Sequence, residues 1–129
     1  MASLSYVHGV SETPLIGSTI GAQFDQIVED HGPNEAVVSL HQGLRYTYEQ
    51  LHAEVTRTAM GLLGAAIKKG DRIGIWSPNN VEWMVLQYAA AKIGAILVNI
   101  NPAYRAHELK HVLEQSGVSL LVAAQGFRS

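Results

Sequence analysis

Histidines are the residues of this 129-residue chain best suited to metal or proton-transfer chemistry, and there are six of them. His107 and His111 lie four residues apart in a segment of helical periodicity, with Glu108 and Glu114 nearby. Two histidines at this spacing share one helix face and can chelate zinc. A solvated helix face gives the same pattern by chance and is the interpretation we favour. The others share no spacing, and we expect surface or local roles for them: His8, His31, His41 and His52.

Carboxylates offer a second kind of candidate chemistry. Glu82 follows the Asn79-Asn80 turn, where an acidic group complements the positive end of a helix dipole. Asp71 precedes an apolar strand, where such a residue more often orders a turn than acts as a base. The chain has no GxGxxG, GxxxxGK[ST] or GxSxG motif. We therefore expect no catalytic residue in this chain.

Tyr104 is a candidate because of its position. It follows Asn101-Pro102, which ends the apolar segment 95–100. We interpret that segment as a central parallel strand covered on both faces. Open α/β sheets bind ligands at the carboxyl ends of such strands, so Tyr104 is a candidate ligand-lining residue. A packing residue is the interpretation that we favour.

Composition limits the classes of protein that fit. Hydrophobic residues make up 47% and charged residues 16%, which is typical of one globular domain. A net charge of −2 does not favour nucleic acid as a partner. The absence of cysteine fits a reducing compartment. We expect a cytoplasmic protein, because the sequence contains neither a membrane-length apolar run nor a secretory signal.

The first half of the chain predicts an arm, a hairpin and two helices. Residues 1–17 contain Pro14 and read as an extended arm lying on another surface. A helix begins at Ser18 or Thr19 and continues to about residue 30. Segments 36–40 and 44–47 form an antiparallel hairpin. A second helix begins with a capping box at Thr47, continues to about residue 68 and ends at Gly70.

The run from 70 to 119 predicts a parallel βαβαβ unit, and the fold class is therefore α/β. The expected strands are 73–76, 95–100 and 118–124, and the expected helices are 80–93 and 105–115. Residues 18–129 form the expected α/β subdomain, with the small N-terminal hairpin beside its sheet. The last helix should place Leu109, Val112 and Leu113 inward.

Four segments, in order, resemble motifs of the AMP-forming acyl-CoA synthetases, which are adenylate-forming enzymes, and an N-terminal region is the fifth point of resemblance. YTYEQL (46–51) resembles an early (L/Y)TYxEL motif, and GDRIGI (70–75) resembles GDRV(A/G)I. NVEW (80–83) resembles N-x-x-E-(W/F), and AKIGAILVNINP (91–102) is similar to KxGAxxVxxNP. The segments at 5–9, 14–17 and 19–21 are more similar to fatty-acid members than to other branches.

The resemblance implies that the chain is part of the large N-terminal domain of such a synthetase. A fatty acid would attack ATP to give acyl-adenylate, and CoA would then displace AMP, with magnesium assisting. The family's phosphate loop, ribose acid and C-terminal lysine have no counterpart here, so the fragment alone should be inactive and bind no cofactor. The resemblance places Asn101, Pro102, Ala103 and Tyr104 near the acyl and pantetheine tunnel, and Arg128 near the CoA phosphates.

Three alternatives remain open from the sequence. Amino-acid-activating or aryl-acid-activating domains and luciferase-like enzymes share these early motifs. A truncated, non-catalytic module could instead pair through the Ala/Gly-rich helix face from Ala59 to Ala66 and form a homo-oligomer. A small enzyme using the His107/His111 pair is the third alternative.

Overall fold

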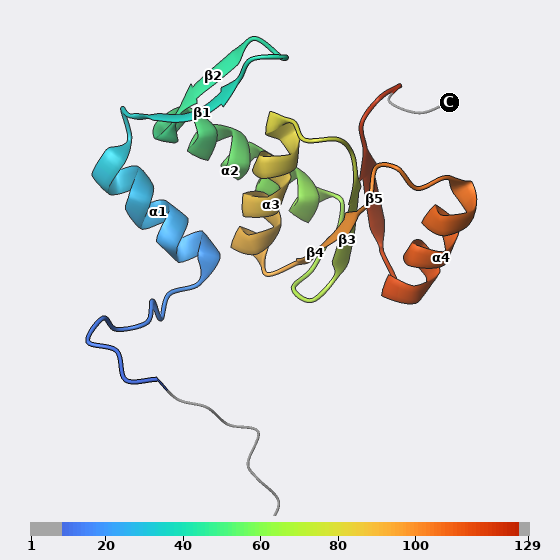
Figure 1. The fold of residues 1–129 in the computed structure, drawn as a ribbon, viewed down its shortest axis with the longest axis horizontal. Coiled ribbons are helices and arrows are strands. Elements are labelled where there is room, and N and C mark those ends of the chain that lie inside the picture. Colours follow the sequence, from blue (N-terminus) through green and yellow to red (C-terminus); the bar gives the residue numbers. More distant parts are fainter. Residues whose placement is uncertain (1–8, 127–129) are drawn as a thin grey trace, which may run out of the picture.

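The computed structural model describes residues 9–126 (Figure 1). Its elements, in chain order, are α1 (Ile20–His31), β1 (Glu35–Ser39), β2 (Leu44–Thr47), α2 (Tyr48–Gly64), β3 (Arg72–Trp76), α3 (Val81–Ile93), β4 (Ile96–Ile100), α4 (Ala106–Ser116) and β5 (Leu120–Ala123). In that part of the chain, no helix is long and apolar enough to cross a bilayer. The prediction of an α/β fold with a hairpin is confirmed.

A three-stranded parallel sheet with strand order β4-β3-β5 forms the centre of the molecule. Helices α1, α2 and α3 lie on one side of it and α4 on the other (Figure 1). This layout follows from right-handed crossovers, because the chain moves from β3 to β4 in one direction and from β4 to β5 in the other.

The expectation that segment 95–100 is a central strand is wrong. In the described sheet β3 is central and β4 is at an edge, because the chain returns past β3 to form β5. Its burial pattern agrees, since Ile96 at the start of β4 is 51% exposed while Ile73 and Ile75 of β3 are buried. Strand order depends on long-range crossovers, which a run of apolar residues does not reveal.

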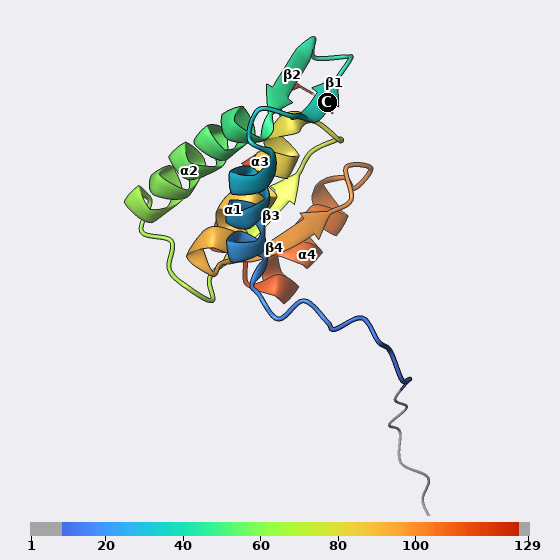
Figure 2. The ribbon, with the colours of Figure 1, turned by 90° about the vertical axis from the view of Figure 1, so that its left-hand side faces the viewer.

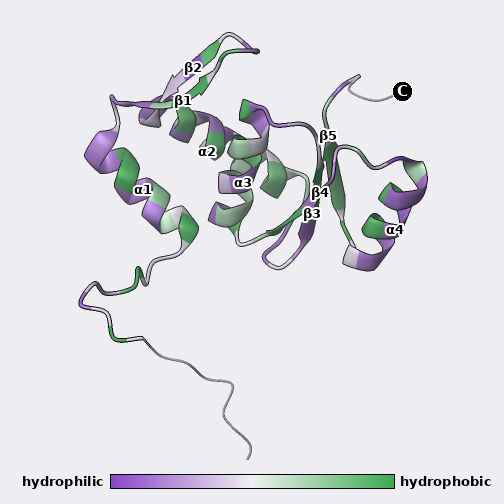
Figure 3. Cartoon of the chain, viewed as in Figure 1, coloured by the Kyte–Doolittle hydropathy of each residue, from purple (hydrophilic) through white to green (hydrophobic). Residues whose placement is uncertain are grey.

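The main core lies between β3 and the three helices on its first side. Buried side chains from α2, β3 and α3 meet there, including Val55, Ile73 and Ala89. Phe24 of α1 joins them by stacking on Tyr88, with ring centroids 4.3 Å apart. Hydrophobic residues line the facing sides of these elements (Figure 3). Gly21 lets α1 approach closely, because a Cβ there would lie 3.2 Å from the Lys92 Cα.

A polar cluster ties α1, α2 and α3 together beside this core. The Lys92 ammonium donates a hydrogen bond to Asp25 Oδ1, and His52 Nε2 lies 3.0 Å from the same oxygen. Lys92 Nζ and His52 Nε2 are 3.3 Å apart. The hydrogen bond from Lys92 is the main reason that the pKa of Asp25 lies below its ordinary value. One carboxylate thus joins three helices.

The capping box predicted at Thr47 is confirmed, but the end predicted for this helix is not. Thr47 Oγ1 accepts from Gln50 N (3.3 Å), and Gln50 Oε1 accepts from Thr47 N (2.9 Å). The helix ends at Gly64, not near residue 68, because Ala66 adopts a left-handed conformation (φ 64°). The Ala66 N–H donates a hydrogen bond to Leu63 O, and the Ile67 N–H donates one to Leu62 O. Together these two bonds form a Schellman motif.

Ala66→Gly should stabilise the protein. A non-glycine residue in the left-handed region lowers the free energy of unfolding by about 1–2 kcal/mol, and glycine removes this cost. Glycine in turn loses more conformational entropy on folding, which offsets about 0.5–1 kcal/mol of the gain. We expect a net increase of about 0.5–1 kcal/mol in the free energy of unfolding, measured by urea titration. Ala65→Gly is the matched control, because Ala65 has φ −82° and glycine there should only destabilise. A loss of stability in Ala66→Gly would contradict the proposed strain.

Helix α4 is fastened at its C-terminal end by a residue of β3. Arg72 Nε donates to Ser116 O (3.0 Å), and its guanidinium also reaches Gly70 O (3.4 Å). A cation here complements the negative end of the helix dipole. The predicted inward residues Leu109, Val112 and Leu113 are half-buried, and no residue of α4 is fully buried. This helix is therefore only partly covered.

The described part of the N-terminal arm leaves the body of the molecule (Figure 2). Residues 9–17 form no helix or strand, and Val10 and Leu15 are 95% and 97% exposed. These residues therefore do not lie on the described core. The predicted boundary between arm and subdomain at residues 17 and 18 stays a prediction.

Candidate functional site

The carboxyl ends of β3, β4 and β5 define the candidate site. The loop after β3 leads to α3 on one face of the sheet, and the loop after β4 leads to α4 on the other. Adjacent strands whose loops depart to opposite faces leave a crevice, where open α/β sheets bind ligands. The structure therefore places the predicted turn at 101–104 on one side of such a switch point and the Ser77–Asn80 loop on the other.

The turn after β4 holds itself in shape. Asn101 Oδ1 accepts from Ala103 N (2.9 Å), and Asn101 O accepts from Tyr104 N (3.0 Å). Pro102 and Tyr104 are half-buried, while Asn101 and Ala103 are exposed. The Asn101 side chain thus orders the turn, and Tyr104 is held close to the end of an edge strand. The ligand-lining role of all four residues stays a prediction.

The start of α4 immediately follows this turn. Glu108 Oε2 accepts a hydrogen bond from the Arg105 backbone N–H at 3.1 Å. Hydrogen bonds from the backbone N–H groups of Glu108 and Arg105 hold the pKa of this carboxyl below its ordinary value. The Glu108 carboxylate is therefore hydrogen-bonded to backbone N–H groups at the N-terminal end of α4, which weakens any role for it as a metal ligand.

The loop after β3 is joined to the hairpin by a network that sequence reasoning missed. Gln42 Oε1 accepts from Val81 N (2.9 Å) and from Ser39 Oγ (2.8 Å), while its Nε2 donates to Glu82 Oε2 (2.8 Å). Gln42 thus fixes the first turn of α3. Its partners in α3 lie 39 and 40 residues away, so no local pattern in the sequence could indicate them.

Asn80 and Ser77 complete the loop. Asn80 Oδ1 accepts from Trp83 N (2.9 Å) and so caps α3 where the sequence predicts the helix to begin, and its Nδ2 donates to Ser77 Oγ (3.0 Å). The buried Ser77 hydroxyl donates to Pro78 O at 2.8 Å. These bonds make Ser77 a structural hydroxyl that shapes the loop. It is not paired with a general base of the kind that would activate a nucleophile.

A hollow of about 390 Å³ opens beside this loop at the carboxyl ends of β3 and β5. Its polar lining comes from Gln42, Ser77, Asn80 and Glu82, and Trp83 supplies an aromatic wall. Amide, hydroxyl and carboxylate groups of this kind can orient a ligand by hydrogen bonding. The hollow can therefore position a group, and its residues do not form an acid–base or nucleophile constellation.

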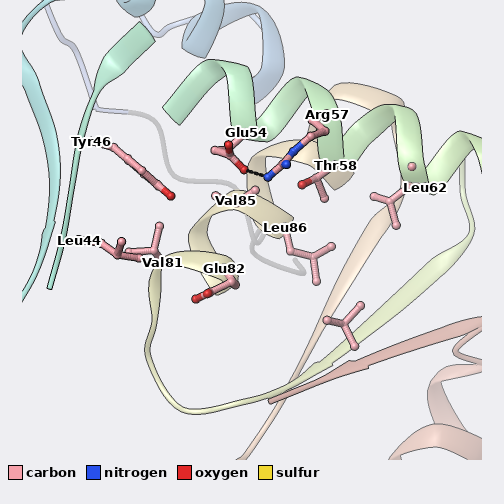
Figure 4. A pocket seen from close by; sticks show the side chains of 12 residues that line it. Leu44, Tyr46, Glu54, Arg57, Thr58, Leu62, Val81, Glu82, Val85 and Leu86 are labelled. Atoms are coloured by element: carbon pink, nitrogen blue, oxygen red, sulfur yellow. Dashed lines mark hydrogen bonds and ion pairs between the residues drawn. The ribbon is translucent and has the colours of Figure 1, made fainter. Parts of the chain in front are cut away.

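A larger groove of about 510 Å³ lies between α2, α3, the hairpin and β5 (Figure 4). Leu62, Val85 and Leu86 form its apolar floor. Arg57 and Glu54 form an ion pair along α2 at its rim. Such a lining suits an apolar group or a covering segment of protein.

The histidine pair on α4 lies away from both hollows. His107 and His111 are exposed. The neighbouring Lys110 Nζ lies 3.7 Å from Glu114 Oε1. Within residues 9–126, no three or more histidine and carboxylate side chains are grouped so that they could hold a metal ion.

Asp71 orders a turn, as the sequence predicts. Its Oδ2 accepts a hydrogen bond from the backbone N–H of Lys68 (2.8 Å).

Arg128, the predicted contact for the CoA phosphates, lies outside the described residues. One alternative from the sequence is that the protein pairs through the Ala/Gly-rich face from Ala59 to Ala66. In the described chain a Cβ at Gly61 or Gly64 would meet nothing within 4 Å, and Met60 and Leu63 are 68% and 56% exposed. This face of α2 is therefore open.

Comparison with known proteins gives a consistent result. Residues 24–128 match the family model described as AMP-binding enzyme. The chain is 40% identical over 129 residues to medium-chain acyl-CoA ligase ACSF2, mitochondrial, of Homo sapiens. It is 42% identical over 114 residues to the putative acyl-CoA synthetase YngI of Bacillus subtilis. The chain spans only 21% of the length of each of these relatives.

Solved structures agree with the sequence comparison. A Mycobacterium tuberculosis fatty acyl CoA synthetase superposes with a TM-score of 0.79 at 35% identity, over 81% of this chain and 21% of that one. The N-terminal subdomain of NpsA from Klebsiella oxytoca superposes with a TM-score of 0.76 at 22% identity, over 85% of this chain and 28% of that one. The second likeness shows the fold alone.

Proposed function

Because the chain belongs to the AMP-binding enzyme family, we propose that it is the N-terminal portion of an ATP-dependent, AMP-forming fatty-acid–CoA ligase. The observation that carries the proposal is the 40% identity over the full 129 residues to a medium-chain acyl-CoA ligase five times as long. In the proposed reaction a fatty acid carboxylate attacks ATP to give acyl-adenylate and pyrophosphate. CoA then displaces AMP and forms the thioester.

In this proposal the chain is scaffold and does not carry the reacting groups. The family uses ATP, and the CoA and magnesium of the reaction are part of the proposal. Asn101, Pro102, Ala103 and Tyr104 would line the acyl and pantetheine tunnel, which their position at the switch point supports. Arg128 is proposed to lie near the CoA phosphates. A cytoplasmic location remains a prediction, and the ACSF2 relatives are named as mitochondrial.

Thioester formation by the complete ligase tests the proposed function. With ATP, Mg²⁺, CoA and octanoate, we expect acyl-CoA and AMP from the complete ligase and neither from the 129-residue chain. A panel of fatty, aromatic and amino acids, scored by pyrophosphate release and by acyl-CoA chromatography, separates the related adenylating chemistries. Activity on amino acids or aryl acids in place of fatty acids would contradict the proposal, as would turnover by the 129-residue chain.

Tyr104→Ala tests the proposed tunnel lining in the complete ligase. Loss of an aromatic wall should raise KM for the fatty acid or for CoA about tenfold, which corresponds to about 1.4 kcal/mol. Lys110→Ala is the control, because Lys110 is exposed on α4 and faces Glu114. Equal KM values for the two variants would remove Tyr104 from the lining.

A second candidate is a non-catalytic interaction module that pairs through α2. The exposed Met60 and Leu63 beside the open Gly61 and Gly64 favour it. Sedimentation of the 129-residue chain decides between the two, because a module of this kind would form an assembly of defined stoichiometry and a monomer would count against it.

A further inference from the structure

The turn between β1 and β2 is attached to the start of α3 by the side chain of Gln42. Gln42 Oε1 accepts a hydrogen bond from Val81 N at 2.9 Å, and Gln42 Nε2 donates one to Glu82 Oε2 at 2.8 Å. Both partners lie in the first turn of α3. Ser39 Oγ donates a third bond to Gln42 Oε1, at 2.8 Å, from within the hairpin. One amide group therefore bonds to the hairpin and to α3 at the same time.

The bond to Val81 satisfies a backbone group that the helix itself cannot satisfy. The first N–H groups of a helix have no partner within that helix. At the start of α3, Asn80 Oδ1 accepts from the Trp83 N–H, and Gln42 Oε1 accepts from the Val81 N–H. Val81 is only 4% exposed, so water has little access to it. Because a buried N–H without a partner is unfavourable, the first turn of α3 should shift when Gln42 is changed.

This first turn borders the crevice between β3 and β4. Residues 77–80 connect the carboxyl end of β3 to α3, and residues 101–104 follow the carboxyl end of the neighbouring β4. The hollow of about 390 Å³ beside the first of these loops includes Gln42 and Glu82 in its lining. The bonded pair of an amide and a carboxylate is thus part of the wall beside the candidate site.

We infer that Gln42 is a positioning residue for the group that binds in this crevice. It holds the loop at 77–80 and the first turn of α3 in place and takes no part in bond making. The inference rests on the proposed function, in which the crevice takes the acyl and pantetheine groups, and it adds to that site a hairpin residue 39 positions away from Val81 in the chain. A displaced loop would weaken the binding of those groups and leave the chemical step intact, which raises KM and leaves kcat unchanged.

An exchange of donor and acceptor in the complete ligase tests the inference. Gln42→Glu keeps an acceptor for Val81 N and Ser39 Oγ, but it sets a carboxylate against Glu82 in place of the amide donor. The double variant Gln42→Glu/Glu82→Gln restores the bond with donor and acceptor exchanged. We expect KM for the fatty acid or for CoA to rise about tenfold in Gln42→Glu, with kcat within about twofold, and to recover in the double variant.

Arg45→Gln is the control for damage to the hairpin alone. It removes the exposed ion pair between Arg45 Nη1 and Glu35 Oε2 (2.7 Å), and neither residue bonds to Gln42. KM should therefore stay at the value of the parent ligase. An unchanged KM in Gln42→Glu would overturn the inference. A rise that Glu82→Gln does not reverse, or an equal rise in Arg45→Gln, would overturn it as well.

The same kinetics separate this inference from the proposed function. KM is measured for whichever acid the ligase adenylates, so a preference for amino acids or aryl acids would remove the proposed function and still decide the role of Gln42. Acyl-CoA formation with equal KM values in all variants would keep the ligase and remove the positioning role. A complete protein that adenylates no acid would overturn both.

Discussion

Gly74→Val should destabilise the chain by about 3 kcal/mol. Gly74 lies in the middle of β3, between Val98 of β4 and Leu121 of β5. A Cβ there would already lie 3.1 Å from Ile100 Cδ1 and 3.2 Å from Leu121 Cδ1. Overpacking a core costs about 1–3 kcal/mol, and valine adds two further methyl groups beyond this Cβ. Since small domains are stable by about 5–15 kcal/mol, urea unfolding followed by circular dichroism will detect the loss.

The same substitution at an open glycine is the control. Gly61 is in α2, where a Cβ would meet nothing within 4 Å, so Gly61→Val should be neutral or slightly stabilising. Leu121→Ala combined with Gly74→Val should recover part of the loss, because it removes one of the methyl groups that clash. A Gly74→Val protein as stable as the parent chain would show that the sheet is not packed as described.

Sequence patterns that act within a few residues predicted the helix boundaries that depend on them. Helix α3 lies within the expected range 80–93, because the side-chain cap Asn80 and the left-handed glycine Gly94 that bound it each act within one helical turn. The end of α2 escaped prediction because an alanine takes the left-handed position that glycine usually fills. The order of the strands escaped it for another reason. An apolar run is compatible with an edge or a centre, and only the path of the crossovers decides.

The candidate site shows the same division. A general rule about strand ends was enough to single out Tyr104, and the family resemblance added the rest of the turn at 101–104. The structure places that turn directly after β4, at a switch point. The groups that shape the neighbouring loop were not predictable. Gln42 acts on residues 39 and 40 positions away, and Arg72 acts on Ser116, 44 positions away. Each looks like an ordinary polar surface residue until the fold brings its partner close.

Lys92→Met should lower the free energy of unfolding by about 1–3 kcal/mol, the usual effect of losing a hydrogen bond between charged groups. The Lys92 side chain is 19% exposed and donates to Asp25, and methionine keeps its apolar stem without the ammonium. Lys69→Met is a control at an exposed lysine outside this cluster. Equal effects of the two substitutions would show that the cluster does not fasten α1 to α3.

The decrease in the free energy of unfolding at acid pH should depend on the same cluster, through Asp25. Its pKa is lowered in the folded protein, chiefly by the hydrogen bond from Lys92, so the folded state favours the ionised carboxylate. This contribution is present above the unfolded pKa of about 3.8 and is lost as the pH falls through the lower folded value. Asp25→Asn should therefore be less stable than the parent chain at pH 7, and the difference should shrink as the pH falls below about 4. Urea titrations between pH 7 and pH 3 measure it. A difference that stays constant over this range would mean that Asp25 stabilises the three helices by packing and not by its charge.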